Sequence, residues 1–161
     1  YKRQDDSLTV TFGGSYDFEV VKIYLGAQYF DEVRLASIGG VLNQAGDGET
    51  MGDLITPINE IAKIKGYGIS LTGDAPLGGG RAMFGVGYLD AEAADSQEAG
   101  LNKNDELSRW IVSAGYDYPF SKRTDVYGVV TYNQDNLKFT GDHADQDPYM
   151  FGVMVGLRHK F

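Results

Sequence analysis

Apolar and polar residues alternate with a period of two in seven segments of this chain. The segments lie at about 7–18, 20–30, 65–73, 81–90, 107–118, 124–134 and 149–161. In the last of them Val153, Val155 and Leu157 alternate with Met154 and Gly156. Successive side chains of a β-strand point to opposite faces, so each segment predicts a strand with one apolar face. The pattern therefore predicts an all-β protein.

The connections between these segments alternate in length. Short turns are expected near 17–19, 73–80 and 119–123, and long external loops near 31–63, 91–106 and 135–148. In an up-and-down meander all short turns lie at one end, an asymmetry typical of outer-membrane barrels. We predict an antiparallel transmembrane β-barrel, with residues 1–161 in a single domain and the C-terminus on the short-turn, periplasmic side. The apolar spacing also indicates a short helix near 54–63 in the first long loop.

Aromatic residues gather near both ends of the predicted strands, on their apolar faces. Amphipathic rings favour the interface between hydrocarbon and water, so two aromatic girdles around an aliphatic band indicate a lipid-facing surface. The predicted lipid-interface residues are Tyr16, Tyr29, Tyr67, Tyr88, Trp110, Tyr116, Tyr118, Tyr132 and Phe151.

The opposite face is rich in Gly, Ser and Thr, with some basic residues, which suits a water-filled lumen. The pore-lining candidates are Lys22, Tyr24, Gln28, Ser70, Thr72, Arg81, Arg109, Ser113, Thr131 and Arg158. Their cations would attract anions, unless each pairs with a nearby acid such as Asp17 or Asp117. Both hypotheses stay open for Arg109, whereas pairing is favoured for Arg158 near the rim.

Composition excludes several classes of protein. The chain lacks cysteine and has a net charge of -9, which excludes a disulfide framework and disfavours nucleic-acid binding. It lacks the long apolar run of a transmembrane helix. Catalytic triads, paired carboxylates and nucleotide-binding motifs do not stand out. We therefore expect no enzymatic activity, no catalytic residue and no cofactor.

Most acidic residues lie in the predicted long loops, where they would either hold divalent cations shared with anionic lipid head groups or simply keep the loops solvated. His143 stands among Asp142, Asp145 and Asp147, but this spacing matches no calcium loop. We therefore predict no metal site.

Two stretches resemble the last strands of Gram-negative general porins, most closely those of β-proteobacteria. They are Gly152-Val153-Met154-Val155-Gly156-Leu157-Arg158-His159-Lys160-Phe161 and the hairpin at 114–127. The resemblance implies a 16-stranded outer-membrane porin, usually a homotrimer, through which small hydrophilic solutes and ions diffuse passively. It also implies contacts with outer-membrane lipid and lipopolysaccharide. An assembly signal read by the barrel-assembly machinery would comprise Val153, Val155, Leu157, His159 and Phe161.

Seven strands are too few for that barrel, and bacterial single-chain barrels have an even number. An open sheet in lipid would leave backbone groups unpaired. We therefore expect the remaining strands to come from an N-terminal part of a longer porin chain. In the family that part also carries the constriction loop, so ion selectivity does not follow from this sequence.

Two other interpretations fit the alternation. A soluble β-sandwich binding module would bury the apolar face in a core. An outer-membrane barrel receptor or enzyme would need a ligand-binding or catalytic cluster at its surface or rim.

Overall fold

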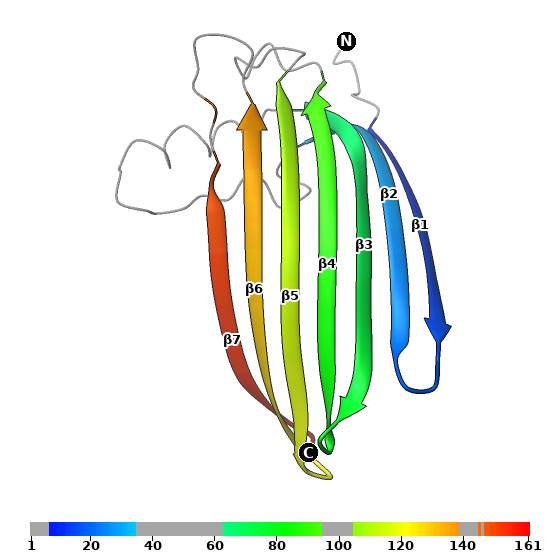
Figure 1. Cartoon of the computed structure of the whole chain (residues 1–161), viewed down its shortest axis with the longest axis vertical. Coiled ribbons are helices and arrows are strands. Elements are labelled where there is room, and N and C mark those ends of the chain that lie inside the picture. Colours follow the sequence, from blue (N-terminus) through cyan, green and yellow to red (C-terminus); the bar gives the residue numbers. More distant parts are fainter. Residues whose placement is uncertain (1–6, 35–62, 95–104, 139–144, 146) are drawn as a thin grey trace.

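The computed structural model describes residues 7–34, 63–94, 105–138, 145 and 147–161, which form one seven-stranded sheet (Figure 1). This confirms the predicted number of strands. The described segments hold no helix long and apolar enough to span a bilayer. The strands are β1 (Leu8–Asp17), β2 (Lys22–Arg34), β3 (Lys63–Leu77), β4 (Gly80–Ala93), β5 (Glu106–Ser121), β6 (Thr124–Lys138) and β7 (Tyr149–His159).

The strands lie in the sheet in the order in which they follow one another along the chain. Each strand pairs with the next in antiparallel fashion, which confirms the up-and-down meander. β1 and β7 form the two edges of the sheet. The β1–β2, β3–β4 and β5–β6 turns all lie at the end of the sheet where the C-terminus is drawn (Figure 1).

The turn between β3 and β4 is much shorter than the predicted segment 73–80. β3 continues to Leu77, which pairs with Gly80, so the turn consists of Gly78 and Gly79 alone. Pro76 suggested a turn but lies inside β3. It is accommodated because β2 stops pairing with β3 at Asp74, and one side of β3 is free of ladder hydrogen bonds beyond that point.

Other strands are also longer than predicted, and the connections between them are correspondingly shorter. β5 runs through Pro119 to Ser121, with a register irregularity between these two residues, so the β5–β6 turn is shorter than 119–123. β2, β4 and β6 extend to Arg34, Ala93 and Lys138, inside the ranges predicted as long loops. The predicted helix near 54–63 lies outside the described residues except for its last position, where β3 begins.

The β3–β4 turn depends on glycine. Gly78 and Gly79 have φ angles of 56° and 85°, in the left-handed region where a side chain costs roughly 1–2 kcal/mol. We expect Gly79→Ala to lower the free energy of unfolding by about that amount in urea titration. Gly152→Ala is the control, because a methyl group there meets no atom within 4 Å. Equal effects of the two substitutions would contradict this account of the turn.

The sheet is a single layer among the described residues, and its apolar face does not pack against a second sheet. Trp110, Val112, Val153 and Val155 are 51%, 49%, 62% and 75% exposed. These are the side chains that a sandwich would bury, so the structure does not favour the soluble-sandwich interpretation. The few buried apolar residues lie near the ends of the strands opposite the short turns, on the other face of the sheet: Phe30, Ile64, Ala91, Ala93 and Leu107.

Candidate functional site

The strand register separates the side chains into two faces. One row of paired residues crosses all seven strands on what we call the apolar face: Gly14, Leu25, Leu71, Val86, Val112, Tyr132 and Phe151. The row one residue further along crosses on what we call the polar face: Ser15, Tyr24, Thr72, Gly85, Ser113, Thr131 and Gly152. The alternation along each strand thus becomes a continuous surface on each side of the sheet.

All ten pore-lining candidates lie on the polar face. Gln28, Ser70 and Arg109 line a hollow of about 300 Å³ in the half of the sheet away from the short turns. Tyr24, Thr72, Arg81 and Ser113 line a second hollow, of about 360 Å³, nearer the short turns. The structure therefore brings residues from β2, β3, β4 and β5 onto one shared wall.

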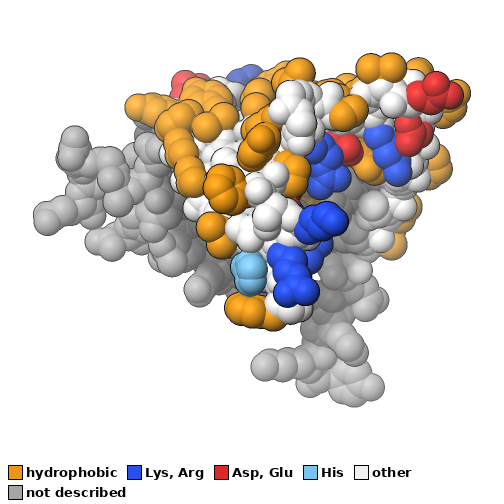
Figure 2. Space-filling model, turned by 90° about the horizontal axis from the view of Figure 1, so that it is seen from below, with side chains coloured by type: hydrophobic (Ala, Val, Ile, Leu, Met, Phe, Trp, Pro, Cys, Tyr) orange, Lys and Arg blue, Asp and Glu red, His pale blue; other side chains and the backbone are white. Residues whose placement is uncertain are grey.

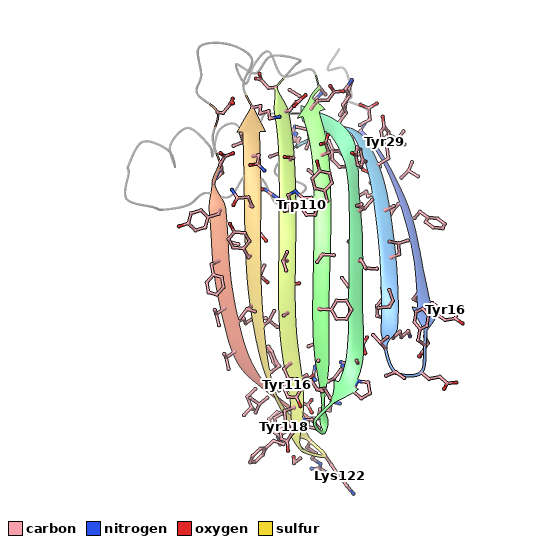
Figure 3. The ribbon with its side chains drawn as sticks, in the orientation of Figure 1. Tyr16, Tyr29, Trp110, Tyr116, Tyr118 and Lys122 are labelled. Atoms are coloured by element: carbon pink, nitrogen blue, oxygen red, sulfur yellow. The ribbon has the colours of Figure 1, made fainter. Side chains whose placement is uncertain are left out.

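The aromatic residues away from the short turns form cross-strand pairs on the apolar face. Tyr29 pairs with Tyr67, and the rings of Tyr88 and Trp110 lie 4.6 Å apart. The Tyr88 hydroxyl donates to Asp90 at 2.8 Å. Figure 3 places Tyr29 and Trp110 in this half of the sheet. The polar tip of Tyr88 is thus bonded to a residue further from the sheet centre, as expected at a membrane interface.

A second aromatic group lies at the short-turn end of the apolar face (Figure 3). The rings of Tyr16 and Phe18 lie 4.6 Å apart, and those of Tyr116 and Tyr118 lie 6.5 Å apart. The Tyr116 hydroxyl donates to the carbonyl oxygen of Leu77 at 2.6 Å. Tyr116 therefore holds the β3–β4 turn, a structural contact that sequence analysis did not predict.

The separation of these groups suits a bilayer. Trp110 and Tyr118 lie eight residues apart on β5, which corresponds to roughly 27 Å along the strand. The apolar band of an outer-membrane barrel is about 25 Å tall. Beyond the aromatic pairs, the apolar face ends in a charged cross-strand row: Lys65, Glu92, Glu106 and Lys138. Charged residues on this face thus lie where the hydrocarbon layer would end.

Arg109 does not stand free on the polar face. Its Nε donates to Asp135 Oδ1 at 2.6 Å and its Nη2 to Asp135 Oδ2 at 2.8 Å. Arg109 is 5% exposed and Asp135 is fully buried. Of the two hypotheses for Arg109, the structure supports pairing, and this fork-shaped bond neutralises the charge.

Sequence analysis missed Asp135 as the partner, because it placed this residue in a loop. The pairing could have been sought from the β5–β6 hairpin, because residues equally distant from a hairpin turn face each other on the two strands. The register shift between Pro119 and Ser121 displaces that count by one residue. Arg109 opposite Asp135 therefore follows only once the irregularity is known.

The remaining basic candidates lie nearer the short turns. Arg158 Nη2 donates to Asp117 at 3.0 Å and to Asp125 at 2.8 Å. Sequence analysis favoured such pairing with nearby acids for Arg158. Arg81 Nη1 lies 4.0 Å from Asp74 Oδ2, and the Lys22 ammonium lies 5.4 Å from the ring centre of Tyr24. Lys22 and Arg81 are thus the candidates whose charge is least neutralised by a close carboxylate.

The predicted assembly residues lie on the last strand and just beyond it. Val153, Val155 and Leu157 are exposed on the apolar face, and Phe161 is fully exposed. The Nδ1 of His159 lies 2.9 Å from the Thr124 hydroxyl. The described residues hold no cluster of three metal-binding side chains, whereas His143 lies outside them.

Comparison with known proteins is consistent with a sheet that has one apolar and one polar face. An outer membrane porin protein of Bordetella pertussis is 31% identical over 151 residues, which are 92% of this chain and 35% of that protein. The chain thus spans about a third of the length of this relative. No solved structure gives a significant match. The sequence profile of the Gram-negative porin family matches residues 1–138, and the chain belongs to this family.

Proposed function

We propose that this chain forms part of the wall of an outer-membrane channel through which small hydrophilic solutes and ions diffuse passively. One observation carries the proposal: an exposed apolar face bounded by aromatic groups lies back to back with a face of small and polar residues. Such a sheet suits hydrocarbon on one side and water on the other. Membership of the porin family points to a channel rather than to an enzyme.

The proposal requires the sheet to close into a barrel. β1 and β7 are the edges of the sheet, and each would leave a row of backbone groups without partners in lipid. The relative from Bordetella pertussis is almost three times as long as the matched segment, so a porin of that size has chain for further strands. We propose that strands of an N-terminal porin segment pair with both edges and complete a barrel, which in this family implies 16 strands and a homotrimer.

The proposed orientation places the short turns and the C-terminus in the periplasm, as is usual for such barrels. The charged row of Lys65, Glu92, Glu106 and Lys138 would then face the lipopolysaccharide leaflet. The exposed last strand, with Phe161 just beyond it, is the segment proposed to engage the barrel-assembly machinery.

Conductance across planar lipid bilayers tests the channel. We expect the full-length protein to open stable pores, and Lys22→Gln combined with Arg81→Gln to lower its relative permeability to anions. The physical reason is that both cations lie on the polar face, where they attract anions. Reversal potentials in a salt gradient measure the change.

Lys138→Gln is the control for this experiment. Lys138 is exposed on the apolar face, so its loss is expected to leave permeability unchanged. A correctly folded full-length protein that opens no pores would overturn the channel proposal. An unchanged reversal potential in the double variant would remove Lys22 and Arg81 from the lumen wall.

A further inference from the structure

Three basic residues meet where the β5–β6 turn touches the C-terminus. Lys122 and Arg123 form the turn, and the backbone N–H of Lys160 donates to the carbonyl oxygen of Arg123 at 2.8 Å. All three residues are exposed. Seen from this end of the molecule, blue basic side chains gather beside the pale blue ring of His159 (Figure 2), and Figure 3 shows Lys122 projecting beyond the sheet.

These three cations differ from several other basic residues of the sheet. Arg158 and Arg81 have carboxylates within 4.0 Å, as do Lys65 and Lys138 at the far end of the sheet. Lys122, Arg123 and Lys160 have no ion-pair partner among the residues that the structure describes. Their charge is therefore available to a ligand outside the chain.

Exposed apolar side chains lie close to the three cations along the chain. Phe120 precedes Lys122 by two residues and is 76% exposed, and Phe161 follows Lys160 and is fully exposed. Tyr118, in the short-turn aromatic group, is also exposed. By the alternation of β7, Lys160 continues the polar face and Phe161 the apolar face, so cations and rings meet at the rim of the sheet. Cations at the rim beside an aromatic belt match the boundary where hydrocarbon meets phosphate head groups.

The other short turns do not share this chemistry. The β1–β2 turn carries Glu19, whose backbone N–H donates to Asp17 at the end of β1, and the β3–β4 turn consists of two glycines. The basic group is thus a local feature of one turn in a chain whose net charge is -9.

We propose that Lys122, Arg123 and Lys160 form a binding site for the head group of an anionic phospholipid in the leaflet that adjoins the short turns. The proposal rests on the membrane orientation given above. The cations bind the phosphate and the flanking rings lie against the acyl chains. Such a site holds the β5–β6 turn and the C-terminus at one leaflet of the membrane.

Native mass spectrometry of the full-length protein, purified with mixed phosphatidylglycerol and phosphatidylcholine, tests this site. Each basic residue near an anionic surface contributes about 1 kcal/mol, or about fivefold in affinity. We expect the unchanged protein to retain phosphatidylglycerol preferentially. The triple variant Lys122→Gln, Arg123→Gln and Lys160→Gln is expected to lose at least about tenfold of that preference.

A matched control removes the same charge elsewhere. Arg34→Gln, Lys65→Gln and Lys138→Gln change three basic residues at the opposite ends of the strands, and the lipid preference should persist. Lys122→Gln with Arg123→Gln leaves the last strand unaltered, so it remains informative if the triple variant fails to fold. Unchanged retention in this folded double variant, or equal loss in the control, would overturn the proposal.

Two further measurements separate this site from its alternatives. Inorganic phosphate at constant ionic strength should not displace the lipid, and displacement at low concentration would instead mean a site for free phosphate. Conductance of the double variant should match that of the unchanged protein. Pores without lipid preference would overturn the lipid site alone, whereas a folded protein without pores would overturn the proposed function.

Discussion

Asp135→Ala is expected to lower the free energy of unfolding of the full-length protein by about 3–5 kcal/mol. Asp135 is fully buried, and its two oxygens accept the Nε and Nη2 hydrogen bonds of Arg109. Removing the carboxylate leaves a guanidinium that is 5% exposed without this partner. The desolvation of that charge then loses the compensation of these two hydrogen bonds. Urea unfolding of the protein in lipid vesicles measures the loss.

Asp125→Ala is the matched control for this substitution. Asp125 also accepts hydrogen bonds from an arginine, Arg158, but that arginine is 53% exposed and keeps Asp117 as a second partner. Exposed ion pairs contribute about 0–1 kcal/mol, so the control is expected to be nearly neutral. Replacing both Arg109 and Asp135 with apolar residues should recover much of the loss, because the arginine charge is then removed together with its partner. Equal effects of Asp135→Ala and Asp125→Ala would mean that water reaches Arg109.

Ala114→Arg is expected to destabilise the protein in a bilayer by about 2–4 kcal/mol, the cost of arginine at the midplane on the lipid face of a barrel. Ala114 lies on the apolar face in the middle of strand β5, four residues from Trp110 and four from Tyr118. Its cross-strand neighbours, Phe84 and Val130, are apolar and exposed. An arginine here would enter hydrocarbon at the greatest distance from both aromatic groups. Urea unfolding in vesicles measures the effect.

Ser113→Arg is the control, one residue away on the same strand. Ser113 lies on the polar face between Gly85 and Thr131, so its side chain would enter the proposed lumen. We expect little loss of stability but a lower single-channel conductance, because the arginine occupies pore volume. If Ser113→Arg destabilised the protein as much as Ala114→Arg, the assignment of lipid and water to the two faces would be wrong.

The alternating pattern was sufficient to predict the strands and their faces. Side-chain direction in a strand follows from position alone, so Val153 and Gly152 were separated correctly without knowledge of any partner strand. Short turns predicted the pairing of β1 with β2, of β3 with β4 and of β5 with β6, because a short turn allows only neighbouring strands to pair. The pairings across the three longer connections followed from the expected up-and-down order and are confirmed by the structure. Turn residues were less informative. Pro76 suggested a turn, yet it fits inside β3, because β2 begins only at Lys22 and its pairing with β3 does not extend beyond Asp74.

The sequence alone determined that the described segments form strands with one apolar and one polar face, because a period of two is a local property of the chain. Only the tertiary structure decided which polar side chains meet. Arg109 finds Asp135 through a register that an irregularity near Pro119 shifts by one position, and Lys160 reaches Arg123 through pairing of β6 with β7. Such contacts depend on the alignment of neighbouring strands, and a shift of a single residue changes every partner.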